Sequence, residues 1–174
     1  MTKNVCNHKP NRREDWGTPP GLFNDLDEIL GFEIDLAATK ENALCKEFVS
    51  PEQDFLSIKS PERLTDGWAW CNPPYGKRGC GAWVKQILKM RKSVTLVPAS
   101  VGTQWFAPVW DLASYVFFIR GRLRFVGAPG PAQFDSCLVI KGDLDLGQYK
   151  KLDAYDRGAL VELSSWFHKS LTNW

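Results

Sequence analysis

Apolar positions along this chain alternate between helical and strand spacing. From residue 22 to residue 30 they recur every three or four positions, which predicts an amphipathic helix. Thr18 and the two prolines after it would open this helix, with Thr18 as N-cap, and Gly31 would end it. Short apolar runs predict strands at 32–36, 47–50, 67–71, 93–97 and 115–119. Helical patterns follow at 39–46, 82–90, 105–112 and 155–171.

Strands and helices therefore alternate through most of the chain, which predicts an α/β fold with a largely parallel sheet. Two further apolar runs, 123–126 and 136–141, flank a loop rich in glycine and proline and predict an antiparallel pair. In open parallel sheets, ligands bind beyond the carboxyl ends of the strands. Asp35 and Asn72 fall at two of these ends, so we expect them to face one crevice.

Length and composition fit one ordinary globular domain. The chain has 174 residues, of which 44% are hydrophobic and 24% are charged. No apolar run approaches the ~20 residues that a membrane span needs. The polar residues 1–15 predict a flexible N-terminal arm rather than a signal peptide, and residues 16–174 would form a single domain.

Charge and cysteine content narrow the choice of partners. The net charge of +2 is too small for a global electrostatic field, so any contact with nucleic acid must use local basic patches. The five cysteines fit no zinc spacing, and Cys6 and His8 lack a second pair of ligands. We therefore expect no metal, no membrane, and reduced thiols as in the cytoplasm.

The sharpest chemical signal is the motif Asn72-Pro73-Pro74-Tyr75, directly after the strand at 67–71. Prolines fix φ and lack an N–H, so the segment is stiff and rich in acceptors. The Asn72 side-chain oxygen and the Pro73 carbonyl can each accept one N–H bond of an aromatic exocyclic amine and stabilise charge that develops as it is alkylated. Tyr75 can stack on a base flipped out of a duplex. A rigid turn that merely caps the strand also explains the prolines.

On this motif the sequence resembles the class I, S-adenosylmethionine-dependent amino-methyltransferases that carry (D/N/S)-P-P-(Y/F). The order of the motifs resembles the gamma-type adenine-N6 DNA methyltransferases, nearest to the compact phage-type Dam-like enzymes, over residues 16–140. The resemblance implies a Rossmann-like class I methyltransferase domain with helices on both faces of the sheet. It also implies S-adenosylmethionine as cofactor and double-stranded DNA as partner. The catalytic motif would comprise Asn72, Pro73, Pro74 and Tyr75.

Three earlier segments extend the resemblance to the cofactor. Residues 16–20 look like the segment that holds the cofactor's carboxylate at a helix N-terminus. Residues 34–38 look like the first-strand motif whose acid takes the methionine ammonium, and residues 53–56 look like the motif whose Asp and Phe bind the adenine. Alone, Asp35 is as typical of a helix cap as of a ligand, and an Asp in the position of Asp54 is more often a turn residue than a binding residue. The resemblance assigns to the cofactor site Trp16, Thr18, Pro19, Asp35, Ala37, Asp54, Phe55 and Asn72.

The sequence also departs from that family pattern. The usual glycine-rich loop after the first strand is absent, and Ala37 lies in its place. The short interval to Asp54 leaves the ribose-binding acid open between Glu41, Glu47 and Glu52. No second domain for target recognition fits this length, so sequence selectivity would come from short loops or be loose.

Two basic groups are candidates for contact with nucleic acid. Lys77 and Arg78 directly follow the Asn72 motif, beside the expected base pocket. Arg120, Arg122 and Arg124 alternate along a predicted strand, so they would share one face and track a phosphate backbone. A solvated strand face explains these arginines equally well.

Other functions remain as alternatives. No histidine or nucleophile lies near a motif, which fits methyl transfer from a sulfonium, a reaction that needs alignment rather than a protein nucleophile. The motif also resembles enzymes that methylate an RNA base or a protein glutamine amide. A nucleic-acid-binding relative without catalysis would explain the lost glycine loop. We expect a monomer or weak dimer in the cytoplasm of a bacterial or phage-infected cell.

Overall fold

The computed structural model describes residues 16–75 and 79–163. The strands are β1 (Phe32–Asp35), β2 (Glu47–Phe48), β3 (Trp68–Cys71), β4 (Ser93–Pro98), β5 (Tyr115–Ile119), β6 (Ser136–Lys141) and β7 (Gly158–Glu162). The α-helices are α1 (Pro20–Leu30), α2 (Gly79–Ile87), α3 (Ala107–Leu112) and α4 (Leu146–Asp153), with short 3-10 turns η2 (Phe55–Ser57) and η3 (Pro61–Arg63).

One sheet of seven strands runs through the molecule in the order β2-β1-β3-β4-β6-β5-β7. The pairs β2–β1, β1–β3 and β3–β4 are parallel, and the pairs β4–β6, β6–β5 and β5–β7 are antiparallel. The predicted α/β fold, largely parallel in its first half and antiparallel towards the C-terminal end, is confirmed. Because β6 is antiparallel to both of its neighbours, β5 runs in the same direction as β4.

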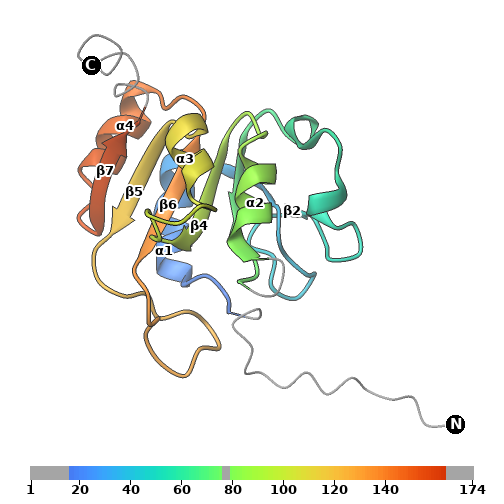
Figure 1. Cartoon of the computed structure of the whole chain (residues 1–174), viewed down its shortest axis with the longest axis horizontal. Helices are drawn as coiled ribbons and strands as arrows, with labels where there is room; N and C mark the ends of the chain where they lie inside the picture. Colours follow the sequence, from blue (N-terminus) through green and yellow to red (C-terminus); the bar gives the residue numbers. More distant parts are fainter. Residues whose placement is uncertain (1–15, 76–78, 164–174) are drawn as a thin grey trace, which may run out of the picture.

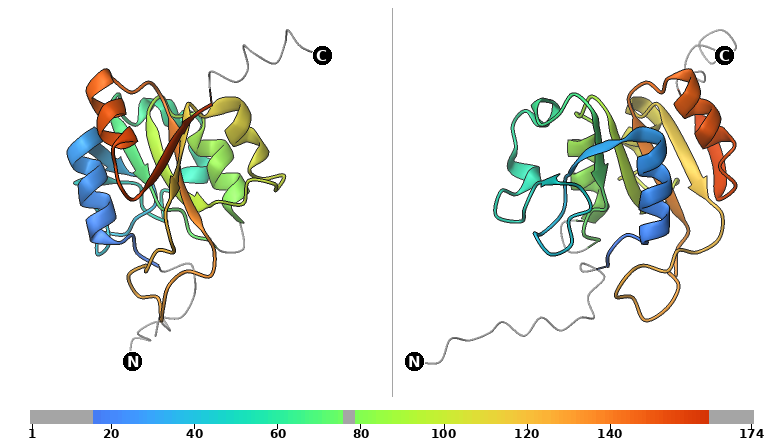
Figure 2. Two further views of the ribbon diagram at one scale, coloured as in Figure 1. Left: turned by 90° about the vertical axis from the view of Figure 1, so that its left-hand side faces the viewer. Right: turned by 180° about the vertical axis from the view of Figure 1, so that it is seen from behind.

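Helices cover both faces of this sheet, as expected. Seen edge-on, α1 and α4 lie on one side of the sheet and α2 and α3 on the other (Figures 1 and 2). The first side buries a cluster around Leu26, Trp70 and Phe117, and the second a cluster around Val84, Phe106 and Val139. Each such apolar side chain contributes roughly 1.5–3 kcal/mol when fully buried, so both layers hold the sheet.

Helix α1 follows the predicted stripe but begins differently. It buries Leu22, Phe23, Leu26 and Leu30, and Gly31 ends it in the left-handed conformation with φ of 70°. The N-cap is Pro19 and not Thr18, and no side chain caps the helix. The prediction of Thr18 as N-cap is therefore wrong, because the second proline already fills the first helical position and shifts the start by one residue.

The predicted helix at 39–46 is also wrong, since this segment forms turns. The backbone N–H of Thr39 donates to Asn42 Oδ1 at 2.6 Å, and the N–H of Leu44 donates to Asp35 Oδ2 at 3.3 Å. Side chains that bond locally to the backbone compete with a helix, and eight residues are too few to overcome them without packing.

Two predictions near the C-terminal end are corrected. Residues 123–126 form no strand; only Val126 makes an isolated bridge, to Gly17, and β6 pairs instead with β4 and β5. Within 155–163 the predicted helix is replaced by β7, while residues 164–171 lie outside the described residues. Gly158 lets β7 approach β5, because a Cβ there would lie 2.1 Å from the Phe118 carbonyl oxygen.

The long segment 120–135 between β5 and β6 extends beyond the sheet at the edge where β5 ends. In Figures 1 and 2 it lies next to the segment that leads into α1. Gly17 and Val126 join the two segments through paired backbone hydrogen bonds of 3.0 and 2.9 Å. This edge, which carries the carboxyl ends of β1 to β5, is where the candidate residues gather.

Candidate active site

Asp35 and Asn72 lie at the ends of neighbouring parallel strands. Asp35 ends β1 and is in register with Trp70 of β3, two positions before Asn72. Both residues therefore lie at the same edge of the sheet, and the expectation that they face one crevice stays a prediction. The turn that contains Asp54 follows β2 on the other side of β1, so the three segments line the same edge.

The Asn72 side chain is fixed by two hydrogen bonds. Its Nδ2 donates to the Trp16 carbonyl oxygen at 3.0 Å, and its Oδ1 lies 2.9 Å from the Tyr75 hydroxyl. The same hydroxyl lies 3.0 Å from the Leu96 carbonyl oxygen of β4. A phenol has one proton, so Tyr75 donates to Asn72 or to Leu96 at any moment, and donation to Leu96 leaves Asn72 Oδ1 free to accept another donor.

The two prolines keep this corner poor in donors. Pro73 is buried and Pro74 is half-buried, and neither has an N–H. In the described part of the chain nothing donates a hydrogen bond to the Pro73 carbonyl. The pairing of this carbonyl with the Asn72 oxygen as two acceptors for one amine stays a prediction.

The Tyr75 ring packs inside a small aromatic group. It lies edge-on to Phe125 at a centroid distance of 6.1 Å and edge-on to Phe134 at 5.8 Å. Trp16 stacks on Phe125 at 5.8 Å with an interplanar angle of 27°. Burial raises the pKa of the Tyr75 phenol well above its ordinary value, so the hydroxyl stays protonated. Stacking of Tyr75 on a substrate stays a prediction.

Asp35 is a buried acid that organises the loop after β1. It is only 4% exposed, and its two oxygens accept the backbone N–H groups of Ala37 at 3.2 Å and Leu44 at 3.3 Å. Burial raises the Asp35 pKa, and these two hydrogen bonds oppose the rise. Among the described residues no cation forms an ion pair with Asp35. The loop is thus held by a carboxylate rather than by glycines, and the carboxylate keeps free lone pairs.

Asp54 and Phe55 are held differently from each other. Asp54 has φ of 46°, a left-handed conformation that non-glycine residues seldom adopt. Phe55 is 1% exposed and stacks on Trp83 of α2 at 5.7 Å. Gln86 of α2, buried as well, donates to the carbonyl oxygens of Phe55 at 3.2 Å and of Ile58 at 2.6 Å. This turn is therefore anchored to α2, and the contact of Asp54 and Phe55 with a cofactor stays a prediction.

Of the two predicted basic groups, only the three arginines at 120–124 lie among the described residues. Arg120, Arg122 and Arg124 do not alternate along a strand, because β5 ends at Ile119 and the residues that follow form a loop. All three are exposed and lie along one cavity of about 540 Å³ that also reaches Pro19. Lys77 and Arg78 lie outside the described residues.

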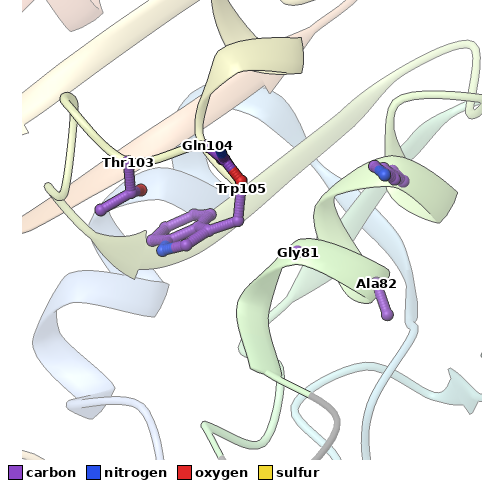
Figure 3. Close-up of a pocket in the computed structure, with 6 residues that line it drawn as sticks. Gly81, Ala82, Thr103, Gln104 and Trp105 are labelled. Carbon is purple, nitrogen blue, oxygen red and sulfur yellow. The ribbon is translucent and has the colours of Figure 1, made fainter.

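A second hollow of about 800 Å³ lies between α2 and the segment before α3. Figure 3 shows the Trp105 side chain beside Gly81, with Thr103 and Gln104 on the same segment. A Cβ on Gly81 would lie 2.9 Å from the Trp105 Cβ, so the two elements are in close contact. Trp83 is buried in the core, whereas Trp105 is only half-buried.

The described residues contain neither a group of side chains suited to a metal ion nor a helix suited to span a membrane. Among residues 16–75 and 79–163 no group of three or more His, Cys, Asp or Glu could hold a metal ion. Within the same residues no helix has the length and apolar character to span a membrane.

The fold and this edge together define the class of protein: an α/β methyltransferase with its chemistry at the carboxyl ends of parallel strands. A family model for DNA N-6-adenine-methyltransferase (Dam) matches residues 6–139. The chain therefore belongs to the Dam family of adenine-specific DNA methyltransferases, as the sequence resemblance indicates. Membership implies a methyl donor and a DNA substrate.

Two phage proteins illustrate the likeness. The DNA N-6-adenine-methyltransferase of Haemophilus phage HP1 (strain HP1c1) is 27% identical over 132 residues, which cover 72% of this chain and 73% of the relative. The DNA N-6-adenine-methyltransferase of Escherichia phage T1 is 28% identical over 116 residues, which cover 64% of this chain and 47% of the relative.

Several residues around the motif were not expected from the sequence. Phe125, Phe134 and the Leu96 carbonyl hold Tyr75, and Gln86 anchors the turn at Phe55. They are distant from the motif along the chain, and apolar or amide residues in separate segments carry no signal of a shared contact.

Proposed function

We propose that this protein transfers the methyl group of S-adenosylmethionine to the N6 amine of an adenine that has left the stack of double-stranded DNA. Asn72 Oδ1 and the Pro73 carbonyl accept the two N–H bonds of the amine. The observation that carries this proposal is the donor-poor corner at Asn72. Next to it, on the neighbouring strand, lies the buried carboxylate of Asp35, which has no counter-ion among the described residues.

The edge residues suit S-adenosylmethionine. A buried carboxylate that lacks a cation is stabilised by an ammonium group, and among residues 16–75 and 79–163 Asp35 has no cationic partner. Thr18, Pro19, Ala37, Asp54 and Phe55 belong to segments at the same edge and would hold the remainder of the cofactor. When bound, the cofactor supplies an electrophilic methyl group and departs as a neutral thioether.

The protein's own contribution is alignment and charge placement. The amine of adenine is a weak nucleophile because its lone pair is delocalised into the ring. Two fixed acceptors draw its hydrogens to one side and stabilise the positive charge that grows on nitrogen. Tyr75 supports this step without ring movement when its hydroxyl turns from Asn72 to Leu96.

The nucleic acid would approach the edge formed by the 120–135 segment. This segment carries Arg120, Arg122 and Arg124 and contacts the Asn72 motif through Phe125 and Phe134. The loops at this edge would also contribute to the choice of target sequence. A cytoplasmic location and a monomeric or weakly dimeric state stay predictions.

The decisive experiment identifies the methylated product. The full chain is incubated with methyl-labelled S-adenosylmethionine and, in parallel, with duplex DNA, RNA and a protein extract. Digestion of the DNA to nucleosides and mass spectrometry should show N6-methyldeoxyadenosine, and sequencing of the methylated sites gives the target. Label in RNA or protein but not in DNA would replace this substrate with one of the alternatives. Tight cofactor binding without any transfer would favour a binding protein.

A further inference from the structure

The cavity beside the 120–124 loop is lined in part by an arginine from a distant part of the chain. Its walls carry Arg120, Arg122, Arg124 and Arg157, together with Asp156. Arg157 precedes β7, an element that the sequence did not predict. The backbone N–H of Arg120 donates to the Arg157 carbonyl oxygen at 2.6 Å, so the edge pairing of β5 with β7 places the two segments together.

Positive charge at this cavity exceeds what the fold neutralises. Arg157 Nε lies 3.5 Å from Asp25 Oδ2, and Arg122 Nε lies 3.9 Å from Asp135 Oδ1. Arg120 and Arg124 have no acidic partner among the described residues. Like charges that face one hollow repel one another, and folding gains nothing from placing them there. Such an arrangement suits an external anion.

We infer that this cavity binds a backbone phosphate of the DNA, with Arg157 as a binding residue beside the arginines of the 120–124 loop. Guanidinium groups bind phosphate through paired, planar hydrogen bonds, and several of them around one hollow give a site rather than a diffuse surface. The inference rests on the proposed function, because it takes DNA as the source of the phosphate.

Packed side chains connect this cavity to the residues around Asn72. Arg124 adjoins Phe125, whose ring contacts both Tyr75 and Trp16. A phosphate held at the cavity therefore fixes the DNA strand through a short, packed connection to the residues around Asn72. Phosphate contacts of this kind set the register of a protein on DNA without reading its sequence.

The test is the salt dependence of binding to a fluorescein-labelled duplex, followed by anisotropy between about 50 and 200 mM salt. Loss of one phosphate contact in Arg157→Gln should lower the slope of log K against log salt by ~0.9 and weaken binding roughly fivefold at about 150 mM salt. Asp156→Asn, which removes an acid of the cavity wall, should strengthen binding. Arg157→Lys keeps the charge but not the planar fork, so the slope should persist while affinity falls.

Matched controls come from the opposite edge of the sheet. Arg91 and Asp66 form an exposed ion pair of 2.5 Å near the amino ends of β3 and β4. Arg91→Gln and Asp66→Asn make the same charge changes and should leave affinity and slope close to the wild-type values. Thermal melts monitor folding of each variant; if Arg157→Gln does not fold, Arg157→Lys and Asp156→Asn still decide the question.

The outcomes separate this inference from the proposed function. If the wild type methylates the duplex but the Arg157 and Asp156 variants bind it like the controls, the phosphate site is refuted and the methyltransferase function stands. If the wild type methylates RNA or protein and binds no duplex, both fail. Loss of affinity in Arg157→Gln without a change of slope would also refute a phosphate contact.

Discussion

Replacement of Asn72 with alanine tests the central chemistry, because the side chain has both a structural and a catalytic part. Asn72→Ala removes the donor to the Trp16 carbonyl oxygen and one acceptor of the Tyr75 hydroxyl. Tyr75 keeps its other acceptor, the Leu96 carbonyl oxygen. Only the Trp16 carbonyl is left without its partner, and it lies in a half-buried residue.

The two consequences differ greatly in size. Loss of one net hydrogen bond lowers the free energy of unfolding by about 1 kcal/mol, and the melting temperature by about 2–4 °C for a domain of this length. A domain with a stability of about 5–15 kcal/mol then remains more than ~99% folded at 25 °C. Loss of a preorganised group that stabilises developing charge lowers kcat by about 10²–10³. Unfolding therefore cannot account for the expected loss of rate.

The aspartate variant separates the two effects further. In Asn72→Asp an oxygen still accepts from the amine and from Tyr75, but no N–H faces the Trp16 carbonyl oxygen. Asn72→Asp should therefore be the less stable of the two variants and yet the more active one. The assay combines thermal melts with single-turnover transfer of labelled methyl to duplex DNA. Asn24, exposed on α1, provides the control, since Asn24→Ala should match the wild type in both measurements.

The reasoning fails if folded Asn72→Ala transfers methyl groups at more than about half of the wild-type rate. It also fails if the two Asn72 variants rank in the same order for stability and for activity. The second result would mean that the side chain acts only by holding Trp16 and Tyr75 in place.

Three further outcomes follow from the structure. Burial raises the Asp35 pKa, so calorimetry should show that S-adenosylmethionine binds more weakly as the pH falls through this raised pKa and the carboxylate is protonated. Over the same pH range, protonation of Asp35 should increase the stability of the unliganded fold. Asp35→Asn should bind the cofactor weakly at every pH. Gly81→Val should lower the free energy of unfolding, measured by heat or urea, by about 1–3 kcal/mol, because a Cβ added at Gly81 would lie only 2.9 Å from the Trp105 Cβ. Gly102→Val should lower it far less, because a Cβ added at Gly102 would meet nothing within 4 Å. Burial and, to a smaller extent, the nearby Asp35 charge raise the Cys45 pKa to about 12. Alkylation at a pH of about 8, followed peptide by peptide, should therefore be slow at Cys45 and faster in Asp35→Asn. Alkylation of Cys45 as fast as that of a free thiol would contradict this environment.

The local signals in the sequence were sufficient for the elements that carry the chemistry. The apolar stripe and Gly31 predict α1, and continuous apolar runs predict β3 and β4. The Asn72 motif follows a buried strand as expected, and its prolines explain the stiff, donor-poor corner. The placement of Asp35 beside it follows from the rule that parallel strands end at one edge.

Errors occurred where short segments had several possible partners. Alternation alone predicts a strand for the arginines at 120–124, but β6, their expected partner, pairs with β4 and β5 and has no edge left for them. The segment around Gly158 read as part of a helix until the exposed edge of β5 gave it a partner. The pairing of a segment depends on which strand edges the rest of the sheet leaves free, and the sequence of that segment alone does not show which edges those are.

The sequence by itself thus determined the class of fold, the order of the motifs and the donor-poor corner at Asn72, because backbone restrictions and periodicity act within a few residues. Only the tertiary structure decided that Tyr75 packs between Phe125 and Phe134 and that Arg157 joins the arginines after β5. Those contacts join residues that lie dozens of positions apart along the chain, and they form only when the whole sheet has selected its strand order.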